Sequence, residues 1–95
     1  MYVLALDIDL HLPECRSLKA KRAVLRPVVE GLRSRFRVSA AEVGGQDLWQ
    51  RARVGVAVVG GTESHVRDVM DEIERWIWAR PGVEVLSVDR AWLDS

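Results

Sequence analysis

The sequence predicts an α+β domain in which a four-stranded antiparallel sheet carries two helices on one face. Three observations predict it. Apolar and polar residues alternate over residues 2–12, apolar residues recur at helical spacing in two later segments, and the elements follow in the order βαββαβ. The chain has 95 residues, of which 48% are hydrophobic, so we expect a single domain over residues 1–95.

The first strand is expected over residues 2–12. Its even positions are apolar, while Asp7, Asp9 and His11 lie among its odd positions, so one face is buried and the other is partly polar. Pro13 ends this strand.

A helix is expected to begin near Leu18, with Ser17 as its N-cap. Apolar residues recur on one side of it, at Leu18, Leu25, Val29, Leu32 and Phe36. Pro27 lies inside this pattern, and an interior proline removes a backbone hydrogen bond. We therefore expect a kink near residues 23–27, or two abutting helices.

Residues 38–43 and 51–59 are expected to form a strand pair joined by a loop over residues 44–50. In the second of these strands one side should face the core, at Ala52, Val54, Val56 and Val58. A second helix follows, with Thr62 or Ser64 as its cap and an apolar stripe at Val66, Val69, Met70, Ile73 and Ile77. Pro81 and Gly82 end it, and residues 83–93 form the last strand, with Leu86, Val88 and Trp92 expected inward.

Two interleaved strand–helix–strand units of this kind form the ferredoxin-like sandwich. That topology brings the start of the first helix and the 44–50 loop to one end of the molecule. It also leaves the second face of the sheet open.

Composition narrows the classes of function. Cys15 is the single cysteine, so the chain forms no internal disulfide, which suits a reducing cytoplasm. Apolar runs are too short for a membrane span, and the first residues lack the pattern of a signal peptide. We expect a cytoplasmic protein with no membrane partner, no metal and no cofactor.

Charge is unevenly distributed along a chain whose formal net charge is zero. Residues 16–37 contain eight bases and one acid, a net charge of +7, whereas residues 63–94 contain eight acids and four bases, a net charge of −4. The first helix is therefore expected to be strongly basic.

The expected end of the molecule carries the candidate anion-binding or nucleic-acid-binding residues, which are Arg16, Lys19, Lys21, Arg22, Gln46, Trp49 and Arg51. Cations at a helix N-terminus oppose the helix dipole, and free backbone N–H groups beside them form an anion site, for which phosphate is the natural guest. The alternative is that these side chains simply extend into water. Trp49 has two interpretations as well: it packs under its own loop, or it stacks on a base or a partner. Trp78 and His11 are also expected near this end.

The open sheet face offers two further candidates. Asp7, Asp9 and His11 suggest a metal or acid–base site, but alternate strand residues lie about 7 Å apart, and cross-strand ion pairs with Arg51 and Arg53 are favoured. Small apolar residues at Val3, Ala5, Gly55 and Ala57 form a smooth candidate interface.

Two motifs carry a family resemblance. "RSLKAKR" at the start of the first helix and "VSAAEVGGQDLWQRARVGVAVV" across the hairpin resemble the YlxP-like family of small uncharacterised bacterial proteins. The resemblance covers essentially the whole chain and implies the ferredoxin-like fold. It also implies genes sited among those for transcription elongation, translation initiation and ribosome maturation, and it carries over no catalytic residues.

Three functions follow as hypotheses. The favoured one is a non-enzymatic accessory protein that binds RNA or the ribosome through the basic helix start and the 44–50 loop. The alternative is a protein-interaction or homodimerisation module that uses the open sheet face. A small phosphate hydrolase on the same fold is disfavoured, because its chemistry is expected to need an arginine–asparagine pair and the chain contains no asparagine.

Overall fold

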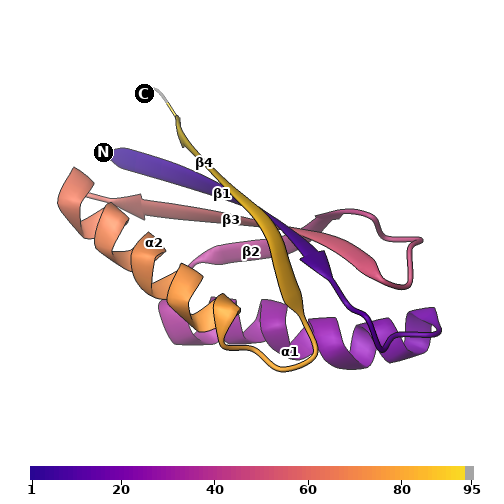
Figure 1. The fold of residues 1–95 in the computed structure, drawn as a ribbon. Helices are drawn as coiled ribbons and strands as arrows, with labels where there is room; N and C mark the ends of the chain where they lie inside the picture. Colours follow the sequence, from indigo (N-terminus) through magenta and orange to yellow (C-terminus); the bar gives the residue numbers. More distant parts are fainter. Residues whose placement is uncertain (94–95) are drawn as a thin grey trace.

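A computed structural model describes residues 1–93 and shows the element order that the sequence predicts. The elements are β1 (Tyr2–His11), α1 (Leu18–Phe36), β2 (Ser39–Gly44), β3 (Arg51–Gly60), α2 (Glu63–Trp78) and β4 (Glu84–Leu93) (Figure 1). The molecule is elongated, with principal extents of 42 × 21 × 19 Å.

The four strands form one antiparallel sheet in the order β2-β3-β1-β4. In the register, Ala5 of β1 lies opposite Ala57 of β3 and Ala91 of β4. Both helices cover the same face of this sheet (Figure 1). The predicted ferredoxin-like fold is therefore confirmed.

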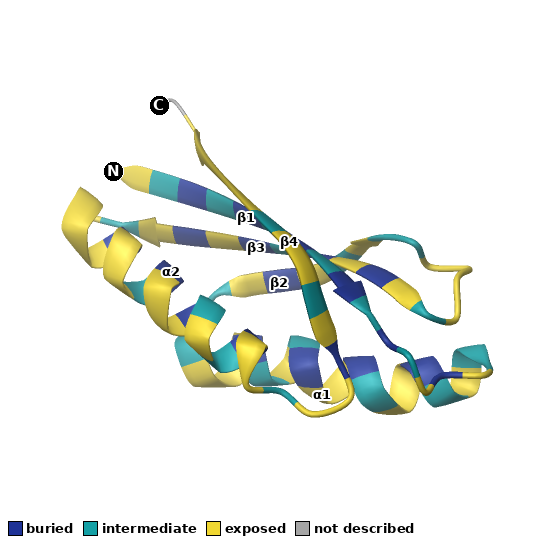
Figure 2. Cartoon of the chain, viewed as in Figure 1, coloured by how far each residue is buried: buried dark blue, intermediate teal, exposed yellow. Residues whose placement is uncertain are grey.

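The core lies between the sheet and the two helices. Burial alternates along β1 and β3, as strand geometry requires when one face is covered (Figure 2). The buried strand residues include Leu4, Leu6, Ile8, Leu10, Ala52, Val54, Val56 and Val58. The helices contribute Leu25, Val28 and Leu32 from α1, and Val66, Met70, Ile73 and Ile77 from α2.

Side-chain caps set where the helices begin. Ser17 Oγ accepts a hydrogen bond from the Ala20 backbone N–H at 3.0 Å, as predicted. Thr62, rather than Ser64, caps α2, because its Oγ1 accepts from the His65 N–H at 3.2 Å. Each cap satisfies one of the backbone donors left free in a first helical turn.

α1 is one continuous helix through Pro27, so the prediction of two abutting helices is wrong. Pro27 lacks a backbone N–H donor, but helix residues before and after it in the sequence pack into the core. Leu25 and Val28 are buried in the core while Pro27 itself is exposed. Tertiary packing therefore outweighs the local preference against helix at this position.

β4 departs from the sequence prediction at Leu86, which is 50% exposed. The pairing of β1 with β4 shifts register between Asp9 and Leu10, and the shift leaves Leu86 outside the regular ladder. Of the other two residues expected inward, Val88 is half-buried against the core, whereas Trp92 is 36% exposed, so burial does not alternate along β4 as it does along β1.

The end of β4 is fastened to α2 by charge. The Arg90 guanidinium donates to Glu74 Oε1 at 2.9 Å and to Asp71 Oδ1 at 2.8 Å. The hydrogen bond with Glu74 is the main cause of a raised Arg90 pKa, desolvation lowers that pKa, and Asp71 raises it further. Trp92 of β4 also faces α2, since the Arg67 guanidinium lies 5.3 Å from the centre of its ring.

Candidate functional site

The loop between β2 and β3, residues 45–50, projects from one end of the molecule (Figure 1). Gly45 begins the turn with a φ of +72°, a backbone conformation that favours glycine, and its carbonyl accepts from the Leu48 N–H at 3.0 Å. Leu48 and Trp49 follow at the tip and are 53% and 52% exposed. Of the two interpretations of Trp49, the structure supports the exposed one.

Lys21 holds this loop against α1. It is 2% exposed, and its Nζ donates to the Gly45 carbonyl at 2.7 Å and lies 3.5 Å from the Gln46 carbonyl. The same Nζ lies 2.8 Å from Glu42 Oε2. This contact is an ion pair without hydrogen-bond alignment, since Glu42 Oε2 has no hydrogen-bond partner among the described residues.

The prediction that Lys21 binds an external anion is therefore wrong. A carboxylate of β2 neutralises its charge, and backbone carbonyls occupy its donors. Lys21 instead fixes the position of the loop that carries Trp49.

Gln50 fastens the other end of the loop. Its Nε2 donates to the Pro13 carbonyl at 3.3 Å and to the Cys15 carbonyl at 3.2 Å. Its own carbonyl accepts from the Leu12 N–H at 2.9 Å. Sequence reasoning gave neither Gln50 nor Glu42 a role; their place in the hairpin motif was the signal available.

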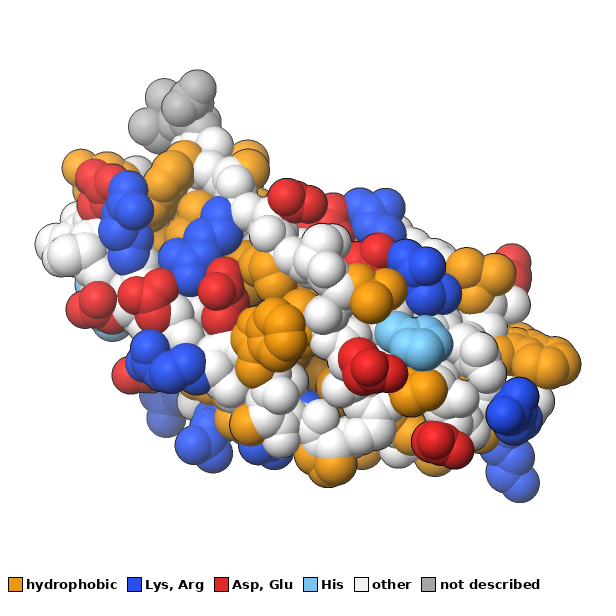
Figure 3. Space-filling view, in the orientation of Figure 1, with side chains coloured by type: hydrophobic (Ala, Val, Ile, Leu, Met, Phe, Trp, Pro, Cys, Tyr) orange, Lys and Arg blue, Asp and Glu red, His pale blue; other side chains and the backbone are white. Residues whose placement is uncertain are grey.

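Exposed cations lie on the α1 side of this loop. Arg16, Lys19 and Arg22 are exposed, and none of them forms an ion pair within residues 1–93. Lys19, Arg22 and Arg26 line a hollow of about 550 Å³ on the outer side of α1. Gln46 is exposed in the loop itself. Figure 3 shows basic and hydrophobic side chains together at the right-hand end, where the loop and the start of α1 lie.

Arg51 lies apart from these residues. It is on the open face of the sheet, where its Nη2 is 2.6 Å from Asp9 Oδ2, whereas α1 covers the opposite face. The sheet therefore separates Arg51 from the helix start with which the sequence grouped it. His11 is also on the open face and pairs with Glu84 at 3.1 Å.

Cross-strand ion pairs occupy the acids of β1, as favoured from the sequence. Arg53 pairs with Asp7 in addition to the pair between Arg51 and Asp9. The hydrogen bond and the charge of Asp7 raise the pKa of Arg53. Within residues 1–93, no three metal-ligating side chains cluster.

Trp78 is 64% exposed but does not belong to the loop end. α2 ends beside the middle of α1 (Figure 1). There Trp76, Arg80 and Pro81 line a hollow of about 300 Å³ with α1 residues from Ala23 to Val28. The expectation that Trp78 joins the loop is wrong, because α2 stops short of that end.

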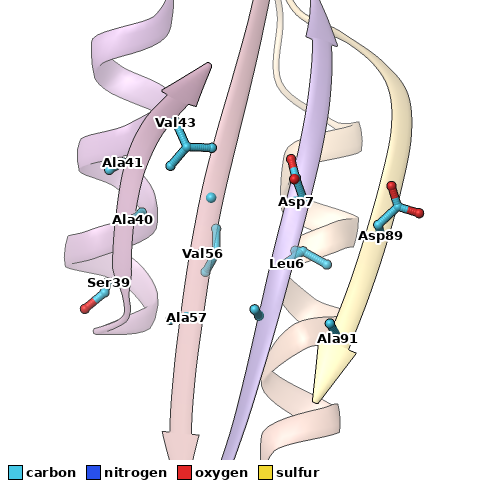
Figure 4. Close-up of a pocket in the computed structure, with 12 residues that line it drawn as sticks. Leu6, Asp7, Ser39, Ala40, Ala41, Val43, Val56, Ala57, Asp89 and Ala91 are labelled. Carbon is cyan, nitrogen blue, oxygen red and sulfur yellow. The ribbon is translucent and has the colours of Figure 1, made fainter. Parts of the chain in front are cut away.

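The open face of the sheet carries a shallow apolar hollow of about 560 Å³ (Figure 4). The hollow is lined by small residues, including Ala5, Gly55, Ala57 and Ala91. Val3 lies two residues before Ala5 in β1, on the same face of the sheet. A Cβ on Gly55 would lie 2.9 Å from Val43 Cγ1, so the glycine lets the Val43 side chain lie across β3. Val3, Ala5, Gly55 and Ala57 therefore share one surface, as predicted.

Comparisons with known proteins agree with this fold and identify relatives. Residues 3–90 match the family described as "Protein of unknown function (DUF503)". An uncharacterised protein of Bacillus subtilis (strain 168), YlxP, is 33% identical over 76 residues, which cover 80% of this chain and 83% of that protein.

A structural likeness extends over the whole chain. A de novo designed protein with a ferredoxin fold, solved by NMR, superposes with a TM-score of 0.55 and 9% identity, covering 100% of this chain and 88% of that one. At this identity the likeness concerns the fold alone. Among the described helices, none is long and apolar enough to cross a membrane.

Proposed function

The chain belongs to the DUF503 family, whose function is unknown. Its role therefore has to be inferred from its own surface. We propose that it is a non-enzymatic RNA-binding accessory protein. The observation that supports this best is the half-exposed Trp49 beside three exposed cations, Arg16, Lys19 and Arg22, which have no acidic partner among residues 1–93. Cations bind backbone phosphates, and an exposed indole ring stacks on a base.

The loop that presents Trp49 is held in place before any ligand arrives. Lys21 and Gln50 hydrogen-bond it to α1 and to the segment after β1. A preorganised loop loses less conformational entropy on binding, so each contact contributes more to affinity. We place this function in the cytoplasm, in association with the ribosome, where structured and unpaired RNA are both abundant.

The test is RNA binding followed by fluorescence anisotropy over a salt series. Trp49→Ala should weaken binding by about 1–3 kcal/mol through lost stacking, and Lys19→Ala/Arg22→Ala should weaken it and flatten its salt dependence. Trp78→Ala is the matched control, because it also removes an exposed tryptophan but one that lies away from the loop.

Wild-type protein that binds no RNA at low salt contradicts the proposal. So does an equal loss of affinity in Trp49→Ala and Trp78→Ala, since binding would then not involve the loop end.

A second candidate function is homodimerisation through the open sheet face. The apolar hollow lined by Ala5, Gly55, Ala57 and Ala91 favours it, because small side chains let a second sheet approach closely. This function is compatible with RNA binding, since it uses the opposite face of the sheet from α1.

A further inference from the structure

Three arginines form a row along the side of α1 that faces β2. At 100° per residue, Arg26 and Arg33 lie about 40° and 20° around the helix from Arg22, so all three lie on one narrow stripe. With a rise of about 1.5 Å per residue, the stripe from Arg22 to Arg33 is about 17 Å long. The three arginines line one groove between α1 and β2, which has a volume of about 210 Å³ and an apolar floor of Leu25 and Val29.

The charge of this groove is positive. Its lining also includes Glu30 and Glu42, but the Lys21 ammonium neutralises Glu42. Three guanidinium groups therefore face one free carboxylate. The net charge of the groove is therefore positive. It favours the binding of an anion that is long enough to contact several arginines in turn.

Arg33 is positioned for this role by the sheet. Its Nε donates to the Ala40 carbonyl of β2 at 2.8 Å, which fixes the plane of the guanidinium above the groove. The two Nη groups keep their N–H donors, which form the fork that matches two oxygens of a phosphate.

The groove continues the site at the loop end, because Arg22 and Arg26 also line the outer hollow with Lys19. A row of about 17 Å is long enough for its arginines to contact successive phosphates of one strand. Positive grooves that track a backbone, combined with an aromatic side chain on which a base stacks, are the means by which proteins bind single strands.

Building on the proposed function, we infer that the groove between α1 and β2 is a track for the backbone of single-stranded RNA. The strand follows Arg22, Arg26 and Arg33, and an unpaired base at the loop end stacks on Trp49. The internal bases of a duplex do not fit this mode, because they are stacked on each other and offer no free face to Trp49.

The experiment compares two variants that each remove two positive charges. Arg26→Ala/Arg33→Ala removes two of the three arginines of the groove, and Arg35→Ala/Arg75→Ala is the matched control. Arg35 lies about 140° around α1 from Arg22, and it lines a different hollow together with Arg75 and Glu72. Because Arg33 also bonds to β2, the single variant Arg26→Ala is measured as well, and circular dichroism checks that each variant is folded.

The probes are a fluorescein-labelled oligouridine of about ten nucleotides, which is longer than the arginine row, and an RNA duplex of equal length. We expect the groove variant to bind the oligouridine about tenfold more weakly than the control variant. The slope of log K against log[salt] should become less steep by about 1.4, which corresponds to the loss of two phosphate contacts of about 0.7 each. Arg26→Ala should show about half of this change in slope.

Four results would overturn the inference. Equal losses in the groove and control variants would mean that only total charge matters. Duplex bound as tightly as the oligouridine would exclude the single-strand mode, and displacement of the oligouridine by poly-glutamate at equal charge concentration would identify an acidic protein as the partner. In these three cases the proposed function is tested separately, by the loss of RNA affinity in Trp49→Ala. Failure of the wild-type protein to bind any RNA would overturn both.

Discussion

Lys21 illustrates how a residue that is basic in the sequence can add nothing to the charge of the surface. Its neighbours Lys19 and Arg22 are exposed, whereas its own ammonium is buried against Glu42 and the Gly45 carbonyl. A buried lysine requires a charged or hydrogen-bonding partner, because desolvation of an unpaired ammonium is very costly. The basic segment thus contains one structural cation among several surface ones.

Lys21 and Glu42 should be coupled in their effect on stability, because removal of one leaves the other without its counter-charge. Lys21→Met leaves the Glu42 carboxylate without its counter-charge, so we expect a loss of about 3 kcal/mol in the free energy of unfolding, at the lower end for a buried pair because Glu42 is partly exposed. The double variant Lys21→Met/Glu42→Leu should lose less than the sum of its single variants, with a coupling of about 1–3 kcal/mol. Urea denaturation of the four proteins measures this cycle.

The control is Lys19→Met, an exposed position of the same helix, which should change stability by less than about 0.5 kcal/mol. Strictly additive losses in the cycle would show that the contact between Lys21 and Glu42 is not energetically coupled.

Sequence reasoning reached the burial of the strand residues but not that of Lys21. Alternation in β1 and β3 is a local signal, so Leu6 or Val56 can be assigned to the core from their neighbours alone. The environment of Lys21 depends on Glu42 and Gly45, which are distant from it in sequence and contact it only in the folded structure. A local pattern carries no information on such a partner.

At the scale of elements, α1 and α2 pack together at Gly31 with no room for a side chain there. A Cβ built there would lie 2.6 Å from Trp76 Cη2 and 2.8 Å from Cζ2. The Trp76 ring has little room to move, because Phe36 packs edge-on at 5.9 Å and the Arg80 guanidinium lies 4.4 Å from the ring centre. Glycine in the middle of this helix is therefore a packing requirement.

Gly31→Ala should destabilise the protein although alanine is the better helix former. The propensity gain is about 1 kcal/mol, while overpacking against a held aromatic ring costs about 1–3 kcal/mol. Thermal denaturation should show a lower Tm for Gly31→Ala and an equal or slightly higher Tm for the exposed control Ser34→Ala. A raised Tm in Gly31→Ala would mean that the helices separate easily at this point.

The elements themselves were well predicted, and the misses have causes that lie far away in the sequence. The cap at Ser17 and the start of α1 follow from a side-chain rule that acts over three residues. The outward position of Leu86 follows from a register shift against β1, and the continuity of α1 through Pro27 follows from core packing on both sides. Neither depends on the residue's immediate neighbours in sequence.

For the whole molecule, topology separates two surfaces that the sequence mixes. Arg51 is close in sequence to Trp49, yet it belongs to the open face with Asp9, while Trp49 stands at the end of the molecule beside the start of α1. The helices cover one face of the sheet only, so a basic helix surface and an apolar sheet surface can serve different partners.

The open face provides the prediction at this scale. If two copies pair there, the wild-type protein should elute as a dimer in size-exclusion chromatography with light scattering. Ala57→Glu should then be a monomer, because it places a charge in the apolar hollow. Ala23→Glu, on the exposed side of α1, is the matched control and should remain dimeric. A wild-type protein that is monomeric at all accessible concentrations would remove this candidate function.

The hydrogen bond from Arg33 to the Ala40 carbonyl has a consequence for solubility. β2 is an outer strand of the sheet, and an outer strand with free backbone groups is a template for strands of other molecules. α1 lies against β2, and the Arg33 side chain occupies an acceptor of that strand while adding a positive charge beside it. The groove arginine thereby also protects this edge of the sheet against aggregation.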